Sequence, residues 1–208
     1  MPKNITKSKV SKKKLSHRAL QTLQKAEDLK FSGKHEKAIA VLETLLVQDP
    51  SCVEAAEEIA DNWLSLDQFE KAQKAAEFAF SLDSQSFIAN HVLGFLQLHQ
   101  ENWDEALKFL KVANESCSNH PEILRCLGWG LFHAGKKNEG MVTIERALTL
   151  DRKNPMILCD LGVCFLQENK IESARALFER AIQLSPKNHR AKECLQIIEK
   201  ISQSSSKA

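Results

Sequence analysis

The chain has 208 residues, of which 43% are hydrophobic and 27% are charged, the composition of an ordinary globular or repeat domain. No apolar run approaches the roughly 18 residues that a membrane-spanning helix needs, and no apolar stretch follows the lysine-rich start. We therefore expect neither an integral membrane protein nor a secretory signal.

Charge is distributed unevenly along the chain. Residues 1–18 hold seven Lys or Arg and no acidic residue, while the whole chain has a formal net charge of only +2, so the remainder carries about −5. We expect residues 1–18 to be a disordered basic tail in front of a mildly acidic body.

The six cysteines form no CxxC pair and show no spacing typical of a disulfide framework. Most lie in apolar helical stretches, where free cysteine behaves as a small hydrophobic residue. This usage favours a reducing compartment, and we expect the protein to be cytoplasmic. No convincing set of metal ligands is clustered in the sequence, so we expect no metal ion and no other cofactor.

After the tail, small residues recur at a constant interval, and such self-similarity is the signature of a repeat architecture. Two series are complete and a third has a single large exception, Leu45. The series are Ala26, Ala60, Gly94, Gly128, Gly162; then Ala38, Ala72, Ala106, Gly140, Ala174; then Leu45, Ala79, Ala113, Ala147, Ala181. The separation of neighbouring members is the same in all three series, and we call it the repeat interval.

Each unit has the pattern of two helices, which is clearest in the fourth. Pro121 stands where the first turn of a helix tolerates proline, and Gly135 stands where a helix ends. Apolar residues between them recur at helical spacing, as they do again in the second half of the unit. Pro155 then repeats the role of Pro121 in the next unit.

This pattern resembles the tetratricopeptide repeat, which has small residues at its eighth, twentieth and twenty-seventh positions. The resemblance implies an all-α, right-handed superhelical solenoid of five helix-turn-helix repeats with a C-terminal capping helix. Gly140, where most repeats have alanine, is interpreted as a weak point for helix formation. The predicted repeats are 19–52, 53–86, 87–120, 121–154 and 155–188, followed by the capping helix at 189–202 and a disordered end at 203–208.

The resemblance also implies a concave groove lined by the first helix of each repeat. In the fourth repeat, Arg125, Trp129 and Phe132 share a stripe one step beyond the predicted packing stripe. Equivalent positions are acidic in the second repeat and apolar or aromatic in the last three. The predicted partner-binding groove consists of Glu57, Asp61, His91, Phe95, Leu98, Arg125, Trp129, Phe132, His133, Met156 and Val163.

Two interpretations of the aromatic residues stay open at this point. Phe95 and Trp129 either contact a partner or fill the space between neighbouring repeats. Mutation would separate them, because a partner contact costs binding energy whereas a buried aromatic residue costs folding energy.

We expect a protein–protein interaction module, such as an adaptor, assembly factor or chaperone, whose groove binds an apolar and basic segment of another protein. Alternatives are a scaffold tethered to nucleic acid or an anionic membrane by the Lys-rich tail, and a self-associating oligomer. No nucleophile, base and orienting group can be assembled from the scattered histidines, so we expect no catalytic residues and no enzyme. The oligomeric state is left open.

Overall fold

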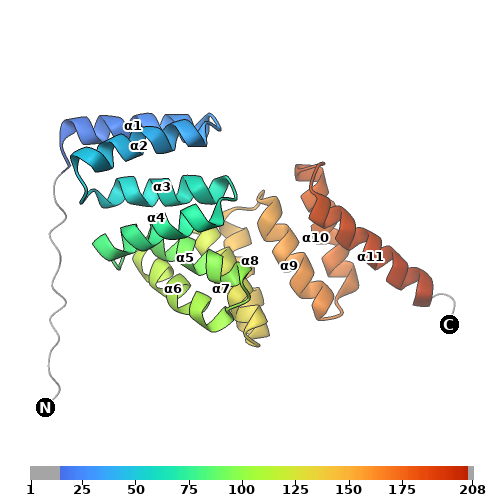
Figure 1. Ribbon diagram of the computed structural model, residues 1–208. Helices are drawn as coiled ribbons and strands as arrows, with labels where there is room; N and C mark the ends of the chain where they lie inside the picture. Colours follow the sequence, from blue (N-terminus) through green and yellow to red (C-terminus); the bar gives the residue numbers. More distant parts are fainter. Residues whose placement is uncertain (1–14, 206–208) are drawn as a thin grey trace, which may run out of the picture.

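The computed structural model describes residues 15–205, and this part of the chain consists of eleven α-helices connected by short turns. Figure 1 shows them stacked in chain order, from the pair α1 and α2 to the final helix α11. The all-α solenoid predicted from the sequence is confirmed. The helices are α1 His17–Phe31, α2 His35–Gln48, α3 Val53–Ser65, α4 Phe69–Leu82, α5 Phe87–His99, α6 Trp103–Ser116, α7 Pro121–His133, α8 Lys137–Leu150, α9 Pro155–Gln167, α10 Ile171–Leu184 and α11 His189–Ser205.

The repeat interval reappears in the helix boundaries. From α3 onward, the first helices begin at Val53, Phe87, Pro121, Pro155 and His189, one interval apart. The second helices begin at 35, 69, 103, 137 and 171, again one interval apart. The register therefore never slips, and equivalent positions of different repeats occupy equivalent places in the stack.

The turn inside each pair has one residue in the left-handed region of backbone conformation. Its φ angle is 69° at Gly33, 54° at Asp67, 60° at Glu101, 86° at Gly135 and 59° at Asn169. These residues also follow one another at the repeat interval, although only two of them are glycine. Residues other than glycine raise the energy of this conformation, and glutamate raises it more than aspartate or asparagine does.

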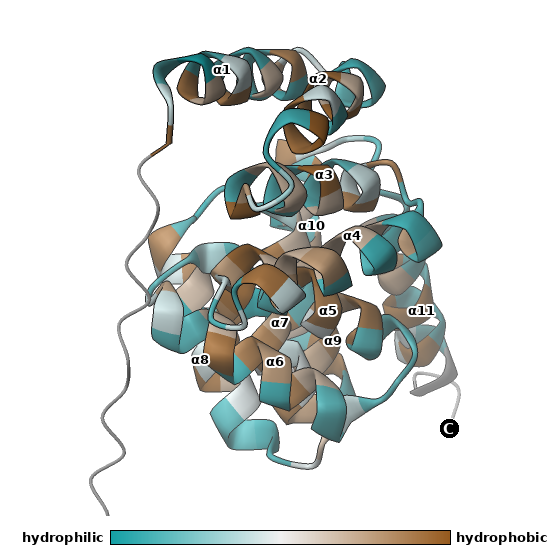
Figure 2. Cartoon of the chain, turned by 60° about the vertical axis from the view of Figure 1, so that its left-hand side comes forward, coloured by the Kyte–Doolittle hydropathy of each residue, from teal (hydrophilic) through white to brown (hydrophobic). Residues whose placement is uncertain are grey.

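The two helices of a pair pack closely at the small residues. A Cβ atom added to Gly94 would lie 2.6 Å from the Leu110 side chain, so α5 and α6 interlock there. Figure 2 shows hydrophobic residues on the facing sides of the helices and hydrophilic residues on the outward sides. The core accordingly consists of hydrophobic clusters that lie between the helices of a pair and extend to the next pair, such as the one shared by α7, α8 and α9.

In the fourth pair, Gly140, a weak point in helix propensity, has a packing role. A Cβ atom on Gly140 would lie 2.6 Å from the Gly128 carbonyl oxygen and 2.6 Å from the Phe132 amide nitrogen. Helix α8 nevertheless runs unbroken from Lys137 to Leu150. Gly140 is needed because the backbones of α7 and α8 approach more closely there than any side chain allows.

Both ends of the helical array differ slightly from the sequence-based boundaries. Helix α1 begins at His17, inside the predicted basic tail, because the Ser16 side chain accepts a hydrogen bond from the Ala19 amide at 3.1 Å and caps the helix. Helix α11 continues to Ser205 rather than ending at 202. The rest of the predicted disordered segments, 1–14 and 206–208, lies outside the described residues.

Helix α11 covers the apolar side of the fifth pair. Ala191 and Ile198 are fully buried against it. The outward surface of α11 is mostly polar, with Lys192, Gln196 and Glu199 exposed beside Ile197 and Ile201. A helix with one apolar and one polar side ends a hydrophobic stack, as expected of a capping helix.

Replacing Glu101 by glycine is expected to raise the free energy of unfolding by up to about 1 kcal/mol, because glycine adopts the left-handed turn without strain. A chemical denaturation curve measures the effect. Lys111→Gly, in the exposed middle of α6, is the control and should instead lower it by about 1 kcal/mol. Equal destabilisation by both substitutions would contradict the strain argument.

Gly140→Ala is expected to lower the free energy of unfolding by about 1–3 kcal/mol, because the added methyl group forces α7 and α8 apart. Helix propensity alone predicts the opposite sign, a gain of up to about 1 kcal/mol. Asn138→Ala, on the exposed side of the same helix, is the matched control and should change little. A Gly140→Ala protein as stable as the wild type would show that the close approach is not needed.

Candidate functional site

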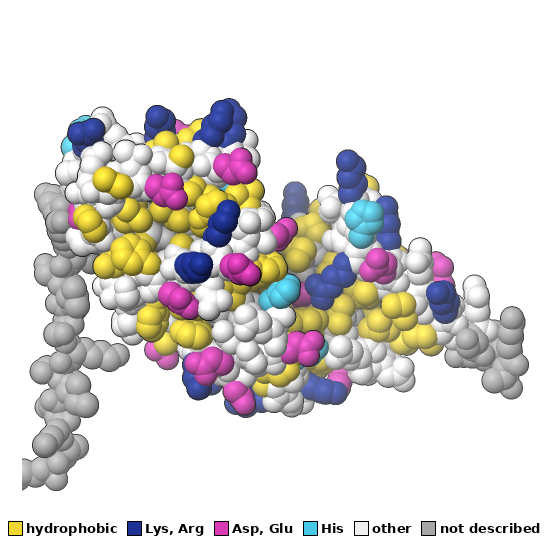
Figure 3. Space-filling view, in the orientation of Figure 1, with side chains coloured by type: hydrophobic (Ala, Val, Ile, Leu, Met, Phe, Trp, Pro, Cys, Tyr) yellow, Lys and Arg dark blue, Asp and Glu magenta, His cyan; other side chains and the backbone are white. Residues whose placement is uncertain are grey.

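A cavity of about 240 Å³ opens between the first helices of the last three repeats and α11. Its apolar wall comes from α5, α7 and α9, and charged side chains close the end beside α11. In the space-filling view, hydrophobic side chains show between the α1–α6 part and the α9–α11 part, next to basic side chains and a histidine (Figure 3). The lining residues are Phe95, Leu98, His99, Arg125, Trp129, Met156, Asp160 and Arg190.

Trp129 belongs both to the core and to the cavity. It is half-buried and packs against two hydrophobic clusters, one shared by α6 and α7 and one shared by α7, α8 and α9. Its ring also lies 4.3 Å from the ring of His133, and the Arg190 guanidinium lies 5.1 Å from its centroid. The two sequence-based interpretations are therefore not exclusive, since the half-buried indole packs against both clusters and also lines the cavity.

Five of the predicted groove residues meet in this cavity, namely Phe95, Leu98, Arg125, Trp129 and Met156. Met156 is the most accessible of them, with 48% of its surface exposed. Phe95 is half-buried and Leu98 is buried, so both form the floor. These five residues come from α5, α7 and α9, the first helices of three consecutive repeats.

Phe132 is not at the groove surface. Only 2% of its surface is exposed, and it packs with Met141, Ile144 and Ile157 between α7, α8 and α9. Trp129 and Phe132 therefore do not share one exposed face of α7. Phe132 lies in the interior because α8 crosses α7 closely at this residue.

The remaining predicted residues surround the cavity without lining it. His133 stacks on Trp103, with ring centroids 4.8 Å apart, and burial lowers its pKa. Val163 is half-buried against α10 and α11. His91 lies 3.7 Å from the Cys126 sulfur, farther along the groove wall.

A chain of ion pairs closes one end of the cavity. Arg125, only 7% exposed, donates to Glu122 and, through Nη1, to Asp160 at 2.5 Å. Arg190 donates to the second oxygen of Asp160, also at 2.5 Å. Burial raises the pKa of the Glu122 carboxyl, but Arg125 outweighs it and leaves the pKa below its ordinary value. Buried charges paired in this way are costly to break, so the arrangement is rigid.

Asp160 and Arg190 were missed in the sequence. Asp160 is a single acid in the apolar run Ile157–Phe165 of α9, and an acid at such a place needs a buried cationic partner. This pattern could have identified Asp160 in the sequence as a residue that needs a cationic partner. No sequence pattern identifies Arg190, because its role depends on how α11 packs against α9.

The predicted acidic end of the groove lies on α3. Glu58 and Asp61 both pair with Lys30 of α1, and the Lys30–Glu58 distance is 3.0 Å. Burial lowers the pKa of Lys30, but these two carboxylates outweigh it and raise the pKa above its ordinary value. Glu57, one turn away, accepts a hydrogen bond from Ser86. Two carboxylates share one lysine here, so the end of the groove remains acidic.

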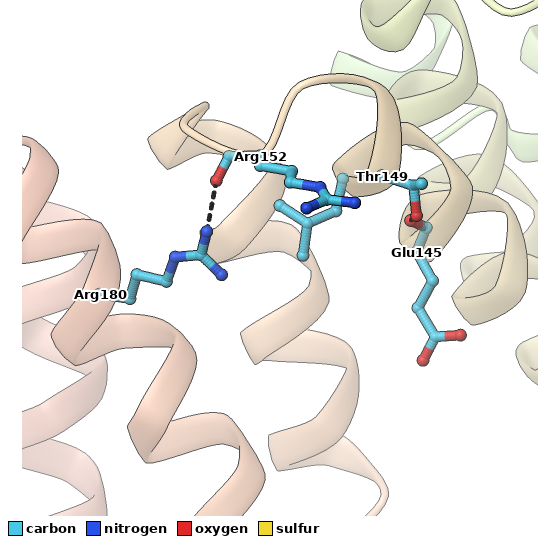
Figure 4. Close-up of a pocket in the computed structure, with 5 residues that line it drawn as sticks. Glu145, Thr149, Arg152 and Arg180 are labelled. Carbon is cyan, nitrogen blue, oxygen red and sulfur yellow. Dashed lines mark hydrogen bonds between the residues drawn. The ribbon is translucent and has the colours of Figure 1, made fainter.

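A second hollow, of about 420 Å³, lies outside the groove and is shown in Figure 4. Arg180 donates a hydrogen bond to the Arg152 carbonyl oxygen at 2.8 Å across it. Glu145, Thr149 and Leu148 complete its mostly polar lining. With a single apolar side chain, it lacks the character of a binding site for an apolar segment.

Within the described residues, no helix is both long enough and apolar enough to cross a membrane.

Comparison with known proteins agrees with this architecture. The family model described as tetratricopeptide repeat matches residues 155–188. The chain is 26% identical over 168 residues to the peroxisomal targeting signal receptor of Saccharomyces cerevisiae, covering 76% of this chain and 27% of that protein. It is 25% identical over 195 residues to the human protein O-mannosyl-transferase TMTC1, covering 88% and 22%. The chain thus spans about a quarter of the length of these relatives.

Two solved structures show the same stack. A thermophilic tetratricopeptide repeat protein of Thermus thermophilus superposes with a TM-score of 0.67 at 19% identity, over 86% of this chain and 99% of that one. YrrB, described as having an unusual peptide-binding site, superposes with a TM-score of 0.59 at 20% identity, over 86% and 92%. Together with the repeat interval that runs through all five helix pairs, these likenesses show that the chain has the fold of tetratricopeptide repeat proteins, and the family model identifies one such repeat at residues 155–188.

Proposed function

We propose that the groove binds a segment of a partner protein, with a large apolar side chain of that segment in the cavity between α5, α7, α9 and α11. The observation that carries the proposal is the cavity itself, in which Phe95, Trp129 and Met156 from three different repeats present apolar surface to solvent. Concave apolar sites with a few fixed polar groups are typical binding sites.

The shape of the cavity favours an inserted side chain over a flat contact. Its volume of about 240 Å³ is enough for one aromatic or long aliphatic side chain and not for a folded domain. Rigid ion pairs at Arg125 and Asp160 keep its charged end in place before anything binds. Preorganisation of this kind lowers the entropy cost of binding.

The charges along the groove favour one orientation of the bound partner segment. Among the residues that the structure describes, Glu58 and Asp61 form their ion pairs with a single lysine, Lys30, so the α3 end attracts cations. The partner segment should therefore carry Lys or Arg toward α3 and its apolar anchor toward α9. YrrB, which has a peptide-binding site by description, supports this use of the fold.

The remaining parts of the proposal follow from the same site. The groove acts as an adaptor, assembly factor or chaperone surface and not as a catalytic one, although one distant relative is a protein O-mannosyl-transferase matched over 22% of its length. We place the protein in the cytoplasm on its cysteine usage.

Met156→Glu is expected to weaken partner binding at least about tenfold and to change the free energy of unfolding by less than about 0.5 kcal/mol. Met156 is 48% exposed, so the fold tolerates the carboxylate, whereas an apolar anchor would bury it at a cost. Affinity capture followed by a binding isotherm with the recovered partner gives the first quantity, and a denaturation curve gives the second.

The control is Val142→Glu, which places the same charge at a 64% exposed apolar residue of α8 that does not line the cavity. Partners must be lost with Met156→Glu and kept with Val142→Glu. If both variants capture the same proteins with equal affinity, the cavity is not the binding site.

Trp129→Ala is expected to affect both folding and binding. Because the indole is only half-buried, we expect a loss of about 1–3 kcal/mol in stability, below the 3–5 kcal/mol typical of a fully buried aromatic residue. Binding should fall by about 2 kcal/mol or more. Trp103→Ala should lower stability alone, because Trp103 packs in the core and does not line the cavity. A Trp129→Ala protein with normal affinity would leave the indole a purely structural role.

A further inference from the structure

Three side chains with metal-binding atoms converge in the groove wall between α5 and α7. They are His91 of α5 and Glu122 and Cys126 of α7, and one ligand atom from each lies within 4.8 Å of the others. The Cys126 sulfur is 3.7 Å from His91 Nε2 and 3.9 Å from Glu122 Oε1. None of these residues lines the cavity described above.

The two sulfur contacts are close to the spacing of ligand atoms around a bound zinc ion, and the His91 and Glu122 ligand atoms, within 4.8 Å of each other, would approach on binding. Zinc–nitrogen and zinc–oxygen bonds of about 2.0–2.1 Å and a zinc–sulfur bond of about 2.3 Å place tetrahedral ligand atoms about 3.3–3.6 Å apart. Only a few tenths of an ångström separate the sulfur contacts from that geometry. A set of one nitrogen, one sulfur and one oxygen suits zinc better than magnesium or calcium, which prefer oxygen alone.

We propose that His91, Glu122 and Cys126 form a zinc-binding site that joins the third and fourth repeats, with the fourth coordination position open to water.

The protonation states permit such a site. Burial lowers the pKa of His91, so its imidazole is neutral and has a lone pair for the metal. Burial raises the pKa of the Cys126 thiol to about 12, so the thiol is protonated without metal. Binding therefore exchanges one proton for one zinc ion: the sulfur–hydrogen bond breaks, a sulfur–zinc bond forms, and the proton passes to the buffer.

Arg125 is the neighbouring cation, and its surroundings partly offset its charge. Its Nε–H donates to Glu122 Oε2 at 2.9 Å and its Nη2 lies 3.4 Å from the Cys126 sulfur. Arg125 Nη2 also donates to Glu122 Oε1 at 2.5 Å. With zinc bound, Glu122 Oε2 keeps its bond to Arg125 Nε, while Oε1 exchanges the Nη2 hydrogen bond for the metal. Asp160 is shared by Arg125 and the partly exposed Arg190, and the Glu122 carboxylate and Cys126 thiolate neutralise the two charges of zinc, so one positive charge remains beside Arg190. Outer hydrogen bonds to a ligating carboxylate are common at metal sites.

The test is a titration of the reduced full-length protein with Zn²⁺ and with Co²⁺, a spectroscopic substitute for zinc. One equivalent of Co²⁺ should produce the near-ultraviolet charge-transfer absorption of a cobalt–thiolate bond, and Zn²⁺ should remove it. Binding should release one proton, measured by calorimetry in buffers of different ionisation enthalpy. Zn²⁺ should also raise the melting temperature.

Cys126→Ser should lose the thiolate absorption, and Cys164→Ser, at another buried cysteine outside the cluster, should keep it. Glu122→Gln, at a partly exposed side chain, should bind Zn²⁺ at least about tenfold more weakly. This variant tests the site if Cys126→Ser does not fold. A wild-type protein without the thiolate absorption overturns the proposal, as does a Cys126→Ser protein that retains it. Neither result depends on whether the cavity binds a partner.

Discussion

The close contact between the two helices of each pair is the constraint on which the rest of this structure depends. A small residue at the same two crossing positions in every repeat lets the backbones approach, and at Gly128 and Gly140 they leave no space for a methyl group. Because the crossing recurs at a constant interval, equivalent helices of successive repeats are stacked at equivalent positions. The curvature of the array, and with it the concave groove, follows from this repetition.

Neighbouring first helices are then joined by polar contacts along the groove. Lys30 of α1 pairs with Glu58 of α3, and Arg125 of α7 pairs with Asp160 of α9. Asp160 in turn pairs with Arg190 of α11. Each contact spans one repeat boundary, and each is at least partly shielded from water, so the groove wall is held in shape by interactions that surface ion pairs do not provide. A surface held in this way presents Trp129 and Met156 in a fixed arrangement.

The sequence predicted the repeats well because their evidence is one-dimensional: a constant interval, with small residues at fixed positions within it. It predicted the groove only in part. Phe95, Leu98, Arg125, Trp129 and Met156 meet as expected, whereas Phe132 is buried, since the inward turn of its stripe depends on how closely α8 crosses α7.

Contacts across repeat boundaries were the hardest to predict. His91 and Cys126 lie in different repeats and adjoin only once α5 and α7 are stacked, and Arg190 reaches Asp160 only through the packing of α11. The packing role of Gly140 was not predicted, because helix propensity describes one helix, while the close approach that requires glycine involves two. Helix propensity and periodicity were thus enough to predict the helices, whereas the candidate site depends on which side chains meet across repeat boundaries.

The central claim, that a partner segment occupies the cavity, is tested most directly by photo-cross-linking. A photoreactive phenylalanine analogue is placed at residue 156, at the mouth of the cavity, or at residue 142, an exposed apolar position of α8. After irradiation in cells, we predict a discrete cross-linked protein from residue 156 and none from residue 142. Mass spectrometry should locate the link in a segment that has an apolar residue at the cross-link and Lys or Arg on one side. Equal cross-linking from both positions, or none from residue 156, would contradict the account.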